Sequence, residues 1–315
     1  MAVILLRRLV QLVVVLLVVT FLSYWLINLL PGDPAVQILG FGGDAHALAQ
    51  VRHQLGLDRP LIVRYVEWLG GLVHGDLGTS YISSVPVGRS LAERMPVTLE
   101  LLVLAQVLAL AVSVPLGMVS ARRAGGFVDR AITTISFGLL STPVFVSGVL
   151  LIMIFAVRWA LLPATGFTPL TSDPLDNVRT LVLPTVTLAA GQLAVYTRVL
   201  RSDLIATLQE DYIMLARARG LSPRRIMWRH ALRPSAISLV TVIGLNLGAL
   251  IGGSVIIETL FGLPGIGRLI VEAIFSRDYL VVQGGVMVVA VGYVIVNFAV
   301  DLLYSGLDPR IRRAA

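Results

Sequence analysis

The side chains that most often carry enzyme chemistry are scarce in this sequence. It has four histidines, His46, His53, His74 and His230, and neither cysteine nor lysine among its 315 residues. Without cysteine there is no thiolate nucleophile or cysteine-held metal, and without lysine a Walker-type phosphate loop is incomplete. The three histidines that share one stretch could suggest a metal site, but solvated loop histidines are the simpler interpretation. We predict no catalytic residue, no metal site and no cofactor in this chain.

A sharp corner between two helices is predicted near Gly220. A helix-favouring stretch runs to Arg219, and Gly220 can end it in the left-handed conformation. Ser222 followed by Pro223 is a typical helix start, and we expect the second helix to end at Pro234, where the next apolar stretch begins.

The surroundings of this corner suit contact with another protein. Ala216 and Ala218 are small enough to let a second surface approach, and Arg217, Arg219 and other arginines flank the corner. A basic loop bound to anionic lipid is the alternative interpretation, but the ordered corner favours a docking element.

The elements that position this corner are apolar stretches of membrane-spanning length. About 20 apolar residues cross the hydrocarbon core. Six such stretches lack Asp, Glu, Arg, Lys and His: residues 9–30, 101–121, 131–157, 180–197, 234–257 and 279–300. The mean hydropathy of +0.88 and the 14% of charged residues agree with a membrane protein.

Arginine placement predicts the orientation of these spans. With both termini in the cytoplasm, the inner segments carry a net charge of +10 and the outer segments −3, as the positive-inside rule requires. The total of +7 therefore reflects topology, and we expect no nucleic-acid partner. Because no span holds an ionisable group, an energy source outside this chain is favoured over a proton-coupled carrier.

Two loops and three polar side chains are further candidates. The outer loop, residues 31–96, should contain two short amphipathic helices, capped by Asp44 and Asp58 and ended by Gly56 and Gly75. The inner loop, residues 198–233, carries the corner. Three polar residues in apolar spans are candidates for a translocation path or for bonds between helices: Gln192, Tyr196 and Asn246.

The inner loop resembles the "EAA" loop of permease subunits of binding-protein-dependent ABC importers, in the dipeptide/oligopeptide/nickel branch. The resemblance lies in Ala216–Ser222 and His230–Arg233, although Met214 and Leu215 replace the first two EAA letters. Further blocks agree in order along nearly the whole chain: 30–35, 55–60, 75–80, 258–267, 277–279, 301–304 and 307–310. The long outer loop is similar to that of the first, or B-type, permease.

This resemblance implies an all-α membrane protein with six transmembrane helices and the type I (MetI-like) fold, forming a single permease domain over residues 1–315. It implies a place in a bacterial or archaeal inner membrane. It also implies a second homologous permease, two ATP-binding subunits that hold ATP and Mg, an extracytoplasmic solute-binding protein and membrane lipid as partners.

The resemblance also implies roles for particular residues. Contact with the ATPase would involve Ala216, Arg217, Ala218, Arg219, Gly220, Leu221, Ser222, Pro223, Arg224, Arg225 and Ile226. Docking of the binding protein would involve Asp44, Asp58, Asp76, Glu258 and Gly265. A di- or oligopeptide is the expected solute, with nickel, glutathione or another small solute as alternatives. A stand-alone carrier or a scaffold without transport function would be the competing classes.

Overall fold

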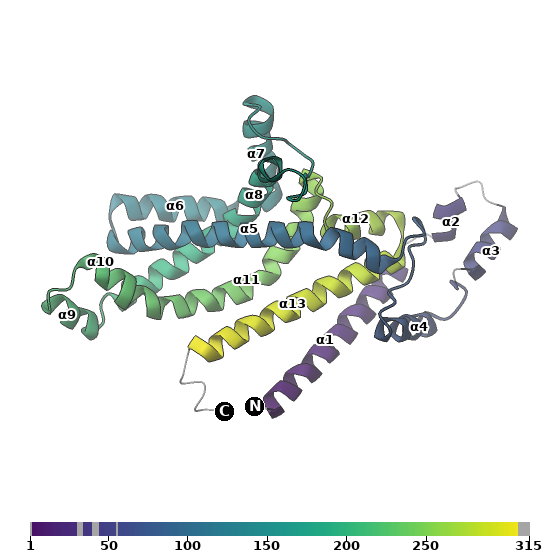
Figure 1. Ribbon diagram of the computed structural model, residues 1–315, viewed down its shortest axis with the longest axis horizontal. Coiled ribbons are helices and arrows are strands. Elements are labelled where there is room, and N and C mark those ends of the chain that lie inside the picture. The colour runs from purple at the N-terminus through teal and green to yellow at the C-terminus, as the bar shows by residue number, and fades with distance from the viewer. Residues whose placement is uncertain (1, 30–33, 40–43, 55, 308–315) are drawn as a thin grey trace. The chain divides into compact units, whose positions relative to one another are not determined.

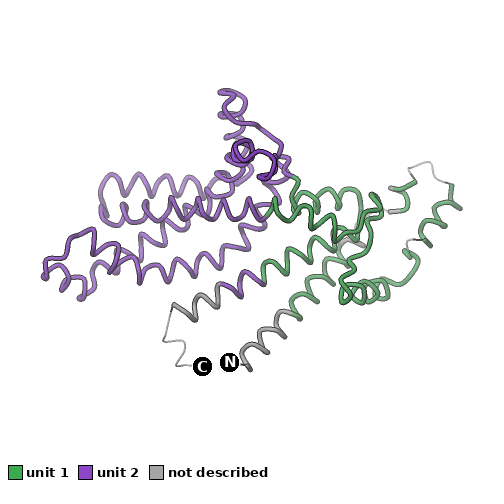
Figure 2. Tube along the Cα trace, in the orientation of Figure 1, with its two compact units in different colours: residues 1–98, 264–294 green, residues 99–263, 295–315 purple. Residues whose placement is uncertain are grey.

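The structure is a computed structural model that describes residues 2–29, 34–39, 44–54 and 56–307, and in these ranges the chain is helical and forms no sheet (Figure 1). Parts of the sequence blocks at 30–35, 55–60 and 307–310 lie outside the described residues. The contacts divide the chain into two compact units. Unit 1 comprises residues 1–98 and 264–294, and unit 2 comprises residues 99–263 and 295–315 (Figure 2).

Unit 1 is built from the N-terminal helices and two helices near the C-terminus. Its elements are α1 (Ala2–Leu29), α2 (Pro34–Leu39), α3 (Ala45–Gln54), α4 (Leu61–Val73), the start of α5 (Val87–Arg122), α12 (Ile266–Ser276) and the first part of α13 (Tyr279–Leu307).

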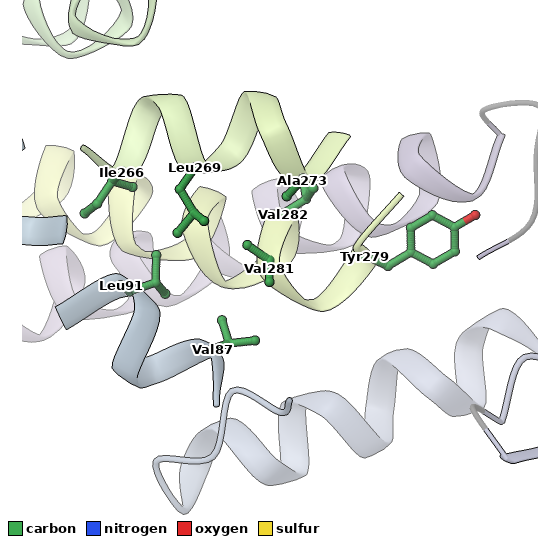
Figure 3. Close-up of a cluster of buried hydrophobic side chains, with 8 residues drawn as sticks. All are labelled: Val87, Leu91, Ile266, Leu269, Ala273, Tyr279, Val281 and Val282. Atoms are coloured by element: carbon green, nitrogen blue, oxygen red, sulfur yellow. The ribbon is translucent and has the colours of Figure 1, made fainter. Parts of the chain in front are cut away.

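One apolar cluster of unit 1 joins α5, α12 and α13. It contains Val87 and Leu91 from α5, three residues of α12 and three of α13 (Figure 3). Two glycines of α13 make this close packing possible. A Cβ at Gly284 would lie 2.6 Å from Val87, and one at Gly285 would lie 2.5 Å from Ile270.

Polar side chains tie the segments of unit 1 together. Tyr65 of α4 and Thr20 of α1 share a hydrogen bond of 2.9 Å, and Gln283 of α13 donates to the Thr20 carbonyl. Ser80 donates to the buried carboxylate of Asp278. Segments that are distant in sequence are therefore joined within this unit.

Unit 2 contains the other helices, with α8 as the central element. They are the rest of α5, α6 (Phe127–Ser141), α7 (Val144–Leu151), η1 (Ile152–Arg158), α8 (Pro174–Thr207), α9 (Asp211–Ala218), α10 (Pro223–Arg225), η2 (Ile226–Ala231) and α11 (Leu232–Phe261). Helix α8 packs against α11, α6 and α7. The turn between α5 and α6 and the corner between α9 and α10 lie at the same end of unit 2 (Figure 1).

Four helical segments of the described residues are long and apolar enough to cross a membrane: 87–122, 174–207, 223–261 and 279–299. The predicted third span, residues 131–157, is not one helix. It is broken between Ser141 and Val144, where the two halves bend by 104°. The cause is Pro143, which lacks an N–H and drives Thr142 to an extended conformation. Residues 9–29 of the predicted first span lie within α1, of which 13–26 forms a shorter apolar segment, and Leu30 lies outside the described residues.

The structure adds to one prediction for the outer loop and corrects another. Helix α5 begins at Val87, so residues 87–96 are helical and continuous with the next predicted span. Asp58 does not cap α4, since Pro60 occupies the cap position and no side chain bonds there. Helix α4 buries Tyr65 and Trp68, whereas Ile62 and Val66 are exposed.

Candidate functional site

The corner between α9 and α10 has the geometry that the sequence predicts. Helix α9 ends at Ala218, and Gly220 follows with φ of +76°, a left-handed conformation that strains residues with a Cβ. Ser222 is the N-cap of α10, where its Oγ accepts a hydrogen bond of 3.4 Å from the Arg225 amide, and Pro223 is the first helical residue.

The corner has a small apolar core of its own. Ile213 and Ala216 of α9 are buried against Ile226, and Leu208 and Leu221 pack around them. Ala216 therefore faces inward, contrary to the idea that it lets another surface approach, while Ala218 is exposed. These contacts join α9 to the helix that follows the corner.

Large apolar side chains remain on the outside of this corner. Met214 and Leu215 are 53% and 54% exposed, although their neighbours Ile213 and Ala216 are buried. The flanking arginines, Arg217, Arg219, Arg224 and Arg225, are exposed as well. An apolar patch within a basic rim is typical of an interface.

The helix after the corner does not end at Pro234, as the sequence predicted. It continues through η2 into α11, so that residues 223–261 form one continuous helical segment. Proline at 234 cannot donate to the carbonyl of His230, four residues earlier. The Tyr212 hydroxyl donates to that carbonyl at 3.4 Å, and the π-helical turn of η2 accommodates the ring.

The three polar residues proposed for a translocation path have different hydrogen-bond partners in the structure. Tyr196 is fully buried and donates to the Gln106 side chain of α5 at 3.2 Å. Asn246 donates to the Val242 carbonyl of its own helix. Tyr196 thus makes the bond between helices that was the alternative interpretation, whereas the bond of Asn246 lies within its own helix.

Gln192 has a different environment. It lines a cavity of about 140 Å³ at the break between α6 and α7, together with Thr142, Ser147 and Thr187. Its Oε1 has no hydrogen-bond partner among the described residues. A buried amide oxygen without a donor is unfavourable, so Gln192 is the path candidate that the geometry retains.

The residues proposed for docking on the outside fall into two groups. Asp44, Asp58 and Asp76 are exposed, and Asp76 also accepts a hydrogen bond from the Gly78 amide. Glu258 and Gly265 are buried and so form no part of the surface in this structure.

One constellation in unit 2 is missed by sequence reasoning. The carboxylate of Asp129, at the start of α6, is 4% exposed and pairs with Arg201 of α8 through two hydrogen bonds of 2.5 and 2.7 Å. It also accepts from Ser120 and from the Gly125 amide. The sequence signal for this pair was Asp129, an acidic residue among arginines just before an apolar stretch. Its partner Arg201 lies 72 residues away, so sequence spacing does not connect the two.

The fold belongs to the type I (MetI-like) class of all-α membrane proteins. Among solved structures, two crystal forms of the inward-facing MetNI methionine ABC transporter are similar to it, with TM-scores of 0.54 and 0.55. They are 18% and 20% identical in sequence. The matches cover 69% and 70% of this chain and 96% of each matched chain.

The sequence comparisons give the family. Residues 113–313 match the model of the inner membrane component of binding-protein-dependent transport systems, and residues 1–102 match the model of its N-terminal region. The chain belongs to this family, and it is a permease component of an ABC importer in the inner membrane.

Curated relatives match over essentially their whole length. A probable peptide ABC transporter permease of Sinorhizobium fredii is 41% identical, covering 99% of this chain and 100% of the relative. A putative peptide transport system permease of Brucella abortus is 38% identical, with 99% of each chain covered. The dipeptide transport system permease DppB of Escherichia coli is 38% identical over 98% of each chain.

Proposed function

We propose that this permease carries di- or oligopeptides and is driven by ATP-binding subunits that dock on the corner between α9 and α10. The names of the relatives support a peptide solute. The observation that carries the docking proposal is the corner itself, because its core is complete while Met214 and Leu215 stay exposed on its surface. Nickel or glutathione remains the alternative solute.

The remaining parts of the proposal follow from the importer class. A second homologous permease completes the translocation path, to which Gln192 contributes. ATP and Mg are bound by the two partner ATPases, and this chain holds no cofactor of its own. Both termini lie in the cytoplasm, and an extracytoplasmic solute-binding protein docks on the outer face near Asp44, Asp58 and Asp76.

A single charge on the corner tests the docking proposal. Leu215→Asp places a carboxylate in the exposed apolar patch, where burial against a partner would be costly. In the assembled transporter we expect binding-protein-stimulated ATP hydrolysis and peptide uptake to fall at least tenfold, with the amount of this permease in the membrane unchanged.

Leu170→Asp is the matched control, since Leu170 is also 54% exposed and lies in the loop between η1 and α8. It should leave ATP hydrolysis and uptake within twofold of wild type. Equal behaviour of the two variants would refute docking at the corner. A separate uptake assay with dipeptides, nickel and glutathione as competitors tests the solute.

A further inference from the structure

A groove on unit 2 lies between α6 and α8. Its volume is about 470 Å³, and it is lined by Thr133 and Phe137 of α6 and by residues of α8 from Val195 to Ser202. The pair of Asp129 and Arg201 joins the two helices at one end of this groove.

The groove lies where the apolar stretches of both helices end. Arg130 is the last charged residue before the apolar stretch of α6, and Arg198 is the first charged residue after that of α8. Such positions lie at the level of the lipid headgroups. Thr133 and Phe137 follow Arg130 at helical spacings of three and seven, so the three residues share one face of α6.

The charge at this end of the groove is positive. Asp129 is already engaged with Arg201, Ser120 and Gly125. Arg198 is exposed, and none of the described carboxylates forms an ion pair with it. Its guanidinium lies over the ring of Phe137, 4.5 Å from the ring centre. Stacking of this kind uses the face of the guanidinium and leaves its N–H groups free to donate in the plane.

Much of the lining of the groove is apolar. Phe137, Val195 and Val199 contribute apolar side chains, and Thr133 and Ser202 contribute hydroxyls beside the arginines. The groove therefore combines an apolar channel with hydrogen-bond donors and a cation at the membrane boundary. A phospholipid has the matching arrangement, since its acyl chain is apolar and its phosphate is an anion that accepts hydrogen bonds.

We propose that this groove binds an anionic phospholipid, with the phosphodiester on Arg198 and one acyl chain against Phe137 and Val195. The occupant is a lipid of the surrounding membrane, because an apolar channel next to an uncompensated arginine matches both parts of that molecule. A helix of the second permease, or a soluble phosphate compound, would need only one of these features.

Lipid binding to the purified full-length chain tests this proposal. Native mass spectrometry would compare palmitoyl-oleoyl phosphatidylglycerol with phosphatidylcholine of the same acyl chains. We expect wild type to retain the anionic lipid at least tenfold better. Arg198→Gln should lower its retention at least fivefold, and Val195→Trp, which fills the channel without changing a charge, should lower retention of both lipids. Arg198→Lys should keep the preference for phosphatidylglycerol.

Arg179→Gln is the matched control, because Arg179 is an exposed arginine at the opposite end of α8. It should bind lipid as wild type does. The proposal is overturned if Arg198→Gln behaves as this control, if phosphatidylcholine binds equally well, or if glycerol 3-phosphate displaces the phosphatidylglycerol. It is also overturned if Val195→Trp retains the lipid but blocks assembly with the second permease. If Arg198→Gln does not fold, Val195→Trp decides.

Discussion

At the scale of single residues, the buried pair of Asp129 and Arg201 is the polar contact of unit 2 with the clearest consequence for stability. The carboxylate accepts four hydrogen bonds, from Arg201, Ser120 and the Gly125 amide. It joins the turn after α5 to the half of α8 that leads to the corner. Removing one partner of a buried pair is costly because the other charge is left uncompensated.

We predict that Asp129→Asn lowers the free energy of unfolding by about 3 kcal/mol. The amide cannot offset the charge of Arg201, and its NH₂ group would face donors. Unfolding of the purified chain in detergent, followed by circular dichroism, measures the change. Glu93→Gln is the control, because its pair with Arg89 is exposed, and it should change stability by less than about 0.5 kcal/mol. Equal losses of unfolding free energy in the two variants would show that the buried pair contributes no more to stability than the exposed pair.

Residue roles were the least predictable part of the site. The sequence shows that Gln192, Tyr196 and Asn246 are polar residues in apolar spans, but not which of them has a partner. Tyr196 finds Gln106 on another helix, whereas Gln192 lines a cavity. Such partners are set by packing between segments that are distant in sequence. The same reason applies to Ala216, which packs into the corner's own core.

At the scale of elements, local signals were reliable where the backbone itself is constrained. Gly220, Ser222 and Pro223 predict the end of one helix and the start of the next, and the structure confirms both. Prolines were harder to interpret. Pro143 breaks a predicted span, while Pro234 lies within a continuous helix because the wide turn of η2 and the Tyr212 hydroxyl compensate for the missing donor.

Helix α13 allows a matched test of packing. We predict that Gly285→Ala destabilises the chain by about 1–3 kcal/mol, since the added Cβ would lie 2.5 Å from Ile270. Gly292→Ala, on the same helix with open space around it, should be neutral or stabilise by about 0.5–1 kcal/mol through helix propensity. Thermal unfolding of the two variants measures the difference. A loss at residue 292 as large as that at residue 285 would contradict close packing as the cause.

At the scale of the whole molecule, the orientation in the membrane is the prediction with the widest consequences. The chain contains no cysteine, so Asp58→Cys and Ala124→Cys each introduce a single thiol at an exposed position. Ala124 lies in the turn between α5 and α6, outside the corner proposed to contact the ATPase. In spheroplasts, a membrane-impermeant maleimide should label Cys at 58 at least tenfold faster than Cys at 124. Permeabilising the membrane should remove that difference in labelling rate. The reverse order of labelling would show that the chain has the opposite orientation in the membrane.

Much of the molecule as a whole could be predicted from sequence. The apolar stretches predicted the helical membrane class, and several blocks in order predicted the family, which the comparisons confirm. The division into two compact units was not foreseen. It arises because residues 264–294 pack with the N-terminal segment, and no local pattern reports which distant segments pack together.

The continuous helical segment from Pro223 to Phe261 has a mechanical consequence. Its 39 residues correspond to about 58 Å of helix measured along the axis. A tilt of about 5° over a helical stretch of this length displaces one end relative to the other by about 5 Å. Coupling between two sites is reciprocal in free energy. If a molecule bound near Phe261 changes the affinity of a partner bound near Pro223, that partner must change the affinity of the molecule by the same factor.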